Sequence, residues 1–320
     1  MKIAVVGCGA LGSYYGAKLC RDGHEVHFLL RSDYETVQKN GVQIFSVDGN
    51  FVVRPHCALK PEEIGQCDLV LIGIKTTGNE QLKKLLPPLT GEKTMVLTLQ
   101  NGLGNEEWIA GIVGQEKVLG GLCYVCLNRL APGEIHHFSG GYVVMGEYKR
   151  LPGERTHNVA DMIRHTGIQC QVIENLERAH WEKLVWNIPF NGLGVAACAG
   201  YEAMVDASVE VRKKNGCMPT DKLLADPRWE RLAREIMLEI IACAEAAGMP
   251  IPMSLAEKQM AFTRKLGCYR ASTLMDFDRG LPLELDSLFV KPLERAHQLG
   301  VRVPFMQRLC DVLKKLSHPA

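Results

Sequence analysis

The chain has 320 residues, 47% of them hydrophobic, and its 37 Lys and Arg residues balance 36 Asp and Glu residues. This length suits two domains with a core each, and the balanced charge gives no field that would attract nucleic acid or an anionic membrane. Because no apolar run approaches the roughly 18 residues of a membrane span and a signal-peptide pattern is lacking, we expect a cytoplasmic protein without nucleic-acid or membrane partners.

The twelve cysteines are scattered through apolar segments, which favours reduced thiols over a disulfide framework. Cys123 and Cys126 form the only C-x-x-C pair. Since no second pair accompanies it, we interpret both as small hydrophobic residues of a strand and expect no metal site.

The first half of the chain alternates strands and helices. Strands are predicted within 2–7, 24–31, 68–75 and 94–102, and helices within 11–23, 80–89 and 108–114. Apolar strands that alternate with helices predict a Rossmann-type, doubly wound parallel sheet covered on both faces. Residues 134–148 are expected to add an antiparallel hairpin with its turn at Gly140–Gly141.

From about residue 173 the pattern becomes helical. Amphipathic stretches at 228–248, 284–300 and 304–316 predict helices, the first closed by Gly248. We therefore predict an α/β architecture with a dinucleotide-binding domain at 1–172 and an all-helical substrate and catalytic domain at 173–320. A more polar segment at about 199–216, with a basic run at 212–214, is interpreted as a local insertion.

The stretch "GCGALG" follows the first predicted strand and opens the first predicted helix, which is the context that a dinucleotide-binding fingerprint requires. Gly7 would make the tight turn, Gly9 would let the backbone approach a pyrophosphate, and Gly12 would permit close helix–strand packing. The phosphates would rest on amides at the helix N-terminus. The predicted cofactor loop is Gly7, Cys8, Gly9, Ala10, Leu11 and Gly12.

The second predicted strand ends in Arg31, where an acidic residue would favour NAD. A guanidinium matches a 2′-phosphate in geometry and charge, so Arg31 favours NADP(H), although a solvated arginine at a strand end is the plain alternative. Lys75 and Asn101 also end predicted strands, at the side of the sheet where doubly wound folds bind ligands. Each could equally be a turn residue.

The helical stretch 179–192 carries an unusual polar row. Lys183, Asn187 and Asn191 are spaced i, i+4 and i+8, so they lie on one face. Bulky apolar residues flank the row on both sides, and Pro189 predicts a kink. A satisfied structural network and a binding surface both fit this pattern.

Taken in order, "GCGALG", Arg31, "IKTT", "QNGLGNEE", "WEKLVWNIPFN" and "PLELDSL" resemble the ketopantoate reductase (2-dehydropantoate 2-reductase) family over nearly the whole chain. The resemblance implies a Rossmann domain, a helical C-terminal domain and an active site in the cleft between them. It also implies reduction of 2-dehydropantoate to pantoate with NADPH, a step of pantothenate biosynthesis.

By the same resemblance, Lys183 matches the catalytic proton donor, and Glu284 matches a glutamate near that lysine and the cofactor. Lys75 matches a lysine near the cofactor, and Asn101 an asparagine that contacts cofactor and substrate. The implied substrate-binding residues are Asn101, Asn187, Asn191 and Ser272.

Two features depart from the family pattern. The insertion follows the polar row, and Thr220 stands where a substrate-contacting asparagine is expected. A related NADP-dependent keto or hydroxy acid oxidoreductase with another substrate therefore stays open, as does a non-catalytic dinucleotide sensor. The expected partner is a small-molecule 2-keto acid, and the helical half could support a homodimer.

Overall fold

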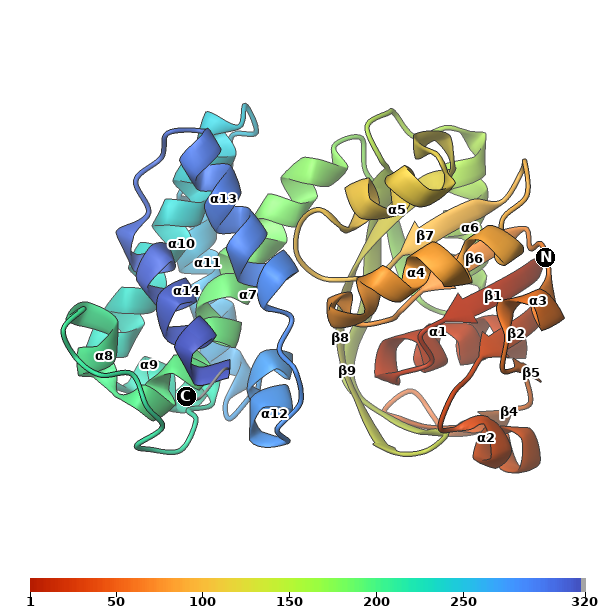
Figure 1. The fold of residues 1–320 in the computed structure, drawn as a ribbon, viewed down its shortest axis with the longest axis horizontal. Coiled ribbons are helices and arrows are strands. Elements are labelled where there is room, and N and C mark those ends of the chain that lie inside the picture. The colour runs from red at the N-terminus through yellow and green to blue at the C-terminus, as the bar shows by residue number, and fades with distance from the viewer. Residues whose placement is uncertain (318–320) are drawn as a thin grey trace. The chain divides into compact units, whose positions relative to one another are not determined.

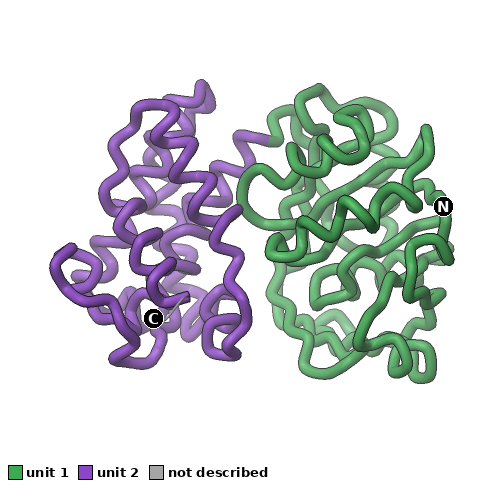
Figure 2. The backbone as a smooth tube through the Cα atoms, in the orientation of Figure 1, with its two compact units in different colours: residues 1–176 green, residues 177–320 purple. Residues whose placement is uncertain are grey.

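A computed structural model of the protein describes residues 1–317. The chain forms two compact units, unit 1 at Met1–Leu176 and unit 2 at Glu177–Ala320 (Figure 2). No helix in the described part is long and apolar enough to cross a membrane.

Unit 1 contains one ten-stranded sheet, and the strand order along it is β4-β3-β9-β8-β7-β6-β1-β2-β5, with β10 paired to β9. The strands are β1 (Lys2–Val6), β2 (Glu25–Leu29), β3 (Val42–Ser46), β4 (Phe51–Val53), β5 (His56–Ala58), β6 (Leu69–Ile72), β7 (Met95–Thr98), β8 (Val118–Ala131), β9 (Glu134–Glu147) and β10 (Gln169–Val172). The helices are α1 (Ala10–Arg21), α2 (Tyr34–Asn40), α3 (Pro61–Ile64), α4 (Asn79–Leu85), α5 (Asn105–Val113) and α6 (Glu154–His165).

Both faces of the sheet are buried, as the continuous apolar strands predict. Successive side chains of a strand point to opposite faces, so Ile3 and Val5 of β1 join one core cluster while Ala4 and Val6 join the other. Helices α1 and α6 pack on the first face, and α3, α4 and α5 cover the second (Figure 1). The fold is thus the predicted Rossmann-type layer arrangement.

The chain reverses its direction of winding beside β1. It runs from β1 to β2, crosses to β3 and β4 beside β9, and adds β5 next to β2. It then returns to β6 on the other side of β1 and continues to β7 and β8. β1, β2, β6 and β7 are mutually parallel along this path. Their carboxyl ends therefore share one edge, and a reversal of this kind is where doubly wound sheets bind ligands.

The hairpin predicted within residues 134–148 is wrong, because these residues form the single strand β9, which pairs antiparallel with the preceding strand β8. β8 and β9 form a long antiparallel pair that turns at Pro132–Gly133, where Gly133 has φ of 70°. Proline followed by glycine suits such a turn because it supplies the fixed φ and then the positive φ. Gly140 and Gly141 lie within β9, where the register shifts opposite Tyr124 and Val125. They mark a bulge, which a glycine pair also accommodates.

Unit 2 is helical, and its described part, residues 177–317, contains no strand. Its elements are α7 (Leu176–Ala196), η4 (Ala197–Ala199), α8 (Tyr201–Val205), α9 (Thr220–Ala225), α10 (Pro227–Ala246), α11 (Ser254–Leu266), α12 (Ser272–Asp278), the π-helical η5 (Asp286–Val290), α13 (Lys291–Gln298) and α14 (Pro304–Ser317). α7 runs without interruption through Pro189. Part of the predicted insertion is regular, because α8 occupies its beginning.

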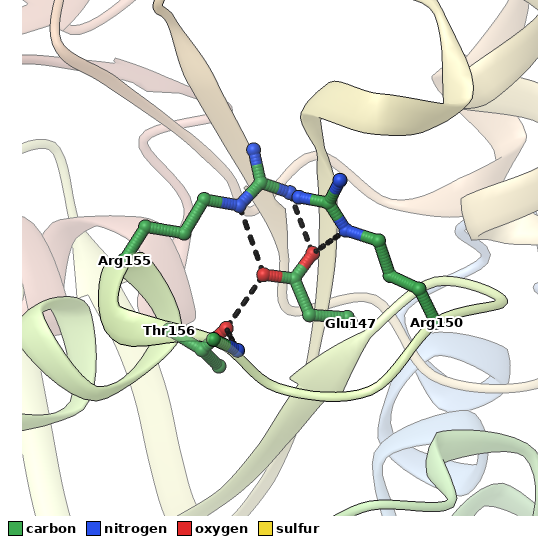
Figure 3. A network of polar contacts seen from close by, with 5 residues as sticks. Glu147, Arg150, Arg155 and Thr156 are labelled. Carbon is green, nitrogen blue, oxygen red and sulfur yellow. Dashed lines mark hydrogen bonds and ion pairs between the residues drawn. The ribbon is translucent and has the colours of Figure 1, made fainter.

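A buried carboxylate joins the end of β9 to α6 in unit 1 (Figure 3). Glu147 accepts hydrogen bonds from Arg150 Nε at 2.9 Å, Arg155 Nε at 2.9 Å, Arg155 Nη2 at 2.5 Å and Thr156 Oγ1 at 2.5 Å. Burial by itself would raise the pKa of Glu147, but the bonds from Arg155, Thr156 and Arg150 outweigh it and hold the pKa below its usual range. The cluster fixes where α6 begins.

Candidate functional site

The glycine loop between β1 and α1 is shaped by two contacts that exclude side chains. Gly7 has φ of 96°, and a Cβ there would lie 2.1 Å from the backbone nitrogen of Ile74. A Cβ on Gly12 would lie 2.2 Å from the carbonyl oxygen of Gly7. Around Gly9, by contrast, a Cβ would meet no atom within 4 Å. Gly9 thus leaves open space next to the backbone, which is what a bound pyrophosphate needs.

The N-terminus of α1 faces this space without a side-chain cap. The first intrahelical bond runs from Ser13 N to Gly9 O, so the amides of the residues between them have no partner within the helix. The first turn carries no acidic residue, and the helix dipole favours an anion there. Cys8 adds backbone only, because its thiol donates to Val5 O and Leu29 O in the sheet.

The end of β2 carries one exposed cation and one engaged carboxylate. Arg31 is exposed. Asp33, the first acidic residue after β2, is buried and accepts from Arg129 Nε at 2.9 Å, from Arg129 Nη2, and from Gly133 N at 3.2 Å. Burial would raise the pKa of Asp33, but the bonds from Arg129 and Ser32 lower it below its usual range. The guanidinium of Arg31 is therefore the charged group that this strand end presents.

Two further strand ends are connected by Gln100, for which the sequence predicts no role of its own. Gln100, two residues after the end of β7, donates from Nε2 to Ile74 O at 2.9 Å and to Asn79 Oδ1 at 2.7 Å. Those two partners flank Lys75, which is exposed, and Asn101 follows Gln100. Gln100 thus holds the loops of Lys75 and Asn101 beside each other. The only sequence signal was its place in the "QNG" turn, which does not reveal its partners.

In unit 2, the polar row lies on a helix whose opposite stripe is core. Trp181, Leu184 and Ile188 are fully buried, as the helical wheel predicts. Asn187 and Asn191 are also buried, at 7% and 4% exposure, whereas Lys183 is half-buried. A cationic side chain near the surface is followed along α7 by two buried carboxamides.

The structure brings Asn191 and Ser272 together across 81 residues of sequence. Ser272 Oγ donates to Asn191 Oδ1 at 3.2 Å, and Thr273 N donates to the same oxygen at 3.1 Å. Asn191 therefore holds the N-terminus of α12 with its carbonyl oxygen. Ser272 is exposed, so this bond connects the buried end of the row to the surface of unit 2.

Glu284 and Thr220 differ in how far they are exposed to solvent. Glu284 is half-buried and lies two residues before η5, where its carbonyl oxygen accepts from Leu288 N at 3.4 Å. Thr220 is 1% exposed, and its hydroxyl donates to Gly267 O at 2.8 Å and accepts from Tyr269 N at 3.2 Å. Thr220 therefore bonds to a neighbouring loop and presents no hydroxyl to solvent.

Comparisons with known proteins place both halves of the chain in one family. Residues 3–150 match the family described as ketopantoate reductase PanE/ApbA, and residues 215–317 match its C-terminal counterpart. A 2-dehydropantoate 2-reductase of Nostoc sp. is 38% identical over 99% of this chain and 95% of the relative. The chain belongs to the ketopantoate reductase family.

Solved structures give the same result for the fold of this family member. A 2-dehydropantoate 2-reductase from Geobacter metallireducens superposes with a TM-score of 0.89 at 41% identity, over 98% of this chain and 99% of the other. The enzyme of that name from Methylococcus capsulatus gives 0.86 at 31% identity, over 99% and 96%. The polar row of α7 lies between the two matched family ranges, within the span that these full-length relatives cover. Membership of this family makes the chain a dinucleotide-binding oxidoreductase.

Two observations bear on the remaining side-chain chemistry. All twelve cysteines lie within residues 1–317, and no disulfide joins any of them there. Among residues 1–317, no three His, Cys, Asp or Glu side chains gather in a way that could hold a metal ion.

Proposed function

We propose that the chain reduces a 2-keto acid to the 2-hydroxy acid with NADPH, and that this substrate is 2-dehydropantoate, which yields pantoate for pantothenate biosynthesis. The relatives that align over its full length bear the name of that reaction. The observation that carries the proposal is the row Lys183, Asn187 and Asn191 on α7, with Asn191 bonded to Ser272. A general acid and several neutral hydrogen-bonding groups are what reduction of a keto acid requires.

The cofactor half of the proposal rests on the loop after β1 and on the end of β2. The open space at Gly9 and the uncapped N-terminus of α1 suit a pyrophosphate. The exposed guanidinium of Arg31 suits a ribose 2′-phosphate, and Asp33 is engaged by Arg129 instead of being presented to a 2′-hydroxyl. We assign NADP(H), with Lys75 and Asn101 as further cofactor contacts.

The chemistry of this chain's side chains follows from where charge develops. A bound nicotinamide cofactor would supply the hydride for the carbonyl carbon, and negative charge would then develop on the carbonyl oxygen. The ammonium of Lys183 stabilises that charge and donates a proton from Nζ to the oxygen. We assign Glu284 to the orientation of Lys183, because a carboxylate attracts an ammonium group. Asn187, Asn191 and Ser272 orient the carboxylate and hydroxyl of the substrate.

The test is steady-state oxidation of NADPH with 2-dehydropantoate, 3-methyl-2-oxobutanoate and pyruvate, each supplied separately. We expect turnover of 2-dehydropantoate with the highest kcat/KM of the three. Turnover of another keto acid alone would contradict the assigned substrate but would agree with the assigned reaction class. A protein that binds NADPH and turns over none of the acids would instead support a dinucleotide sensor.

Replacement of Lys183 tests the proton donor. We expect Lys183→Ala to lower kcat by at least ~100-fold and leave the Kd for NADPH nearly unchanged, because general acid catalysis typically contributes 10²–10⁴-fold. Lys183→Arg keeps the charge but is a poor proton donor at neutral pH, so it should recover little activity. Lys258→Ala, at an exposed position of α11, is the control. Near-normal turnover of Lys183→Ala would remove this lysine from its role.

Replacement of Arg31 tests the choice of cofactor. We expect Arg31→Ala to weaken binding of NADPH by roughly 10- to 100-fold, the equivalent of one or two charge-assisted hydrogen bonds. Binding of NADH should change little, because it has no 2′-phosphate. Fluorescence titration of both cofactors measures the two constants. An equal effect on NADH and NADPH would contradict a 2′-phosphate contact.

A further inference from the structure

An aromatic pair borders the polar row of α7. Trp186 is one helical turn from Lys183 and precedes Asn187, so it lies on the flank of the row. Its ring contacts Phe190 at a centroid distance of 5.3 Å and Tyr269 at 5.9 Å. Phe190 is fully buried, whereas Trp186 and Tyr269 are half-buried. Trp186 and Tyr269 therefore form an apolar surface, called the wall below, that is partly buried and partly exposed.

The orientation of Trp186 is fixed by a hydrogen bond that reaches another helix. Its Nε1 donates to Thr263 Oγ1 of α11 at 2.9 Å, and Thr263 Oγ1 donates onward to Gln259 O at 2.7 Å. Thr263 is fully buried. A ring with a partner for its only polar atom, and with a second ring against its side, is held in one position.

Tyr269 is held by Thr220, the residue that replaces the asparagine expected from the family. Besides the two hydroxyl bonds described above, Thr220 N donates to Tyr269 O at 3.0 Å. Three residues later, Ser272 is bound to Asn191. The segment from Tyr269 to Ser272 is thus fastened at both ends, and it carries one aromatic ring and one proposed substrate-binding hydroxyl.

We propose that Trp186 and Tyr269 form the wall that contacts the substituent at C3 of the 2-keto acid, and that Thr220 is a positioning residue for this wall. The proposal rests on the proposed function. Lys183, the two asparagines and Ser272 account for the carbonyl oxygen and the carboxylate of a keto acid. The substituent at C3 then lies to one side of the row, and the rings offer it an apolar surface. A branched C3 carbon gains from that contact, whereas the methyl group of pyruvate gains little.

The first test compares kcat/KM for 3-methyl-2-oxobutanoate with kcat/KM for pyruvate. In the unchanged protein we expect the branched acid to be preferred. Trp186→Ala should reduce this ratio by at least ~10-fold, because each methylene in an apolar pocket contributes roughly 10- to 200-fold in discrimination. Trp186→Phe should keep the ratio within about 3-fold, since it retains an aromatic face. Tyr269→Ala, a half-buried loop position, supplies the same readout if Trp186→Ala does not fold.

The second test separates positioning from general stability. Thr220→Val keeps the size of the side chain and removes its hydroxyl. It should raise KM for the branched acid more than for pyruvate with little change in kcat. Thr220→Ser restores the hydroxyl and should restore the ratio.

The outcomes distinguish this inference from the proposed function. Variants that lower kcat/KM for both acids by the same factor would overturn the wall and leave the reductase assignment intact. An unchanged protein that does not prefer the branched acid would have the same consequence. A protein that reduces no 2-keto acid would overturn the proposed function and the wall with it.

Discussion

Removal of the Glu147 carboxylate should destabilise unit 1 more than removal of any one of its partners. The carboxylate accepts four hydrogen bonds, three of them from arginine nitrogens, and its side chain is 1% exposed. Breaking a buried ion pair by deleting one partner typically destabilises a protein by about 3–5 kcal/mol. The side chains of Arg155 and Arg150 are 29% and 40% exposed, so water can solvate them afterwards. We therefore expect the lower end, about 3 kcal/mol, for Glu147→Gln.

The assay is urea unfolding followed by circular dichroism at several pH values. Because the folded pKa of Glu147 lies below its unfolded value, the stabilisation is complete above the unfolded pKa of about 4.3 and disappears as the pH falls through the folded pKa. The difference between the unchanged protein and Glu147→Gln should be full at pH 7 and shrink in acid. Arg150→Gln, which removes one half-exposed partner, should lower the free energy of unfolding by about 1 kcal/mol or less.

Three results would refute this reasoning. The first is a loss below about 1 kcal/mol for Glu147→Gln at pH 7, which would mean that the cluster adds little beyond its desolvation. The second is an equal loss for Arg150→Gln. The third is a difference between Glu147→Gln and the unchanged protein that persists after the carboxylate is protonated.

Three further predictions concern two positions of the glycine loop and a carboxylate at the start of α14. Gly9→Ala should fold normally, because a Cβ there meets no atom within 4 Å. It should raise the Kd for NADPH, because the methyl group would occupy space proposed for the pyrophosphate. Unchanged cofactor binding would contradict the proposed phosphate position. Gly7→Ala should lower the melting temperature clearly, since it combines φ of 96° with a backbone clash, and a melting temperature equal to that of Gly9→Ala would disprove it. Glu239 accepts from Phe305 N and Met306 N at the start of α14, and burial raises its pKa to about 7. A raised carboxyl pKa means that the free energy of unfolding decreases as the pH rises from about 4.3 to 7. Glu239→Gln should therefore make the free energy of unfolding less dependent on pH in this range. An identical pH dependence in both proteins would argue against titration of Glu239.

Local sequence was sufficient for the elements whose signals are short in range. The strand–glycine–helix order around Gly7 predicted the turn, because positive φ and close backbone contact require glycine wherever they occur. The spacing of Lys183, Asn187 and Asn191 predicted one polar face, because helical periodicity depends only on residue number. The hairpin shows the limit of such rules. Pro132–Gly133 and Gly140–Gly141 are both glycine-containing turn signals, and only the pairing of β8 with β9 decided which of them is the turn.

The sequence by itself thus determined the sheet with helices on both faces, the glycine turn after β1 and the polar row of α7. Only the tertiary structure decided the partners of these groups. In the folded chain Asn191 accepts a hydrogen bond from Ser272, Asp33 accepts one from Arg129, and the hydroxyl of Thr220 accepts one from the backbone of Tyr269. Each of these pairs joins residues at least 49 positions apart. Hydrogen bonds over such distances depend on how complete helices and strands pack, and no local pattern of residues encodes that packing.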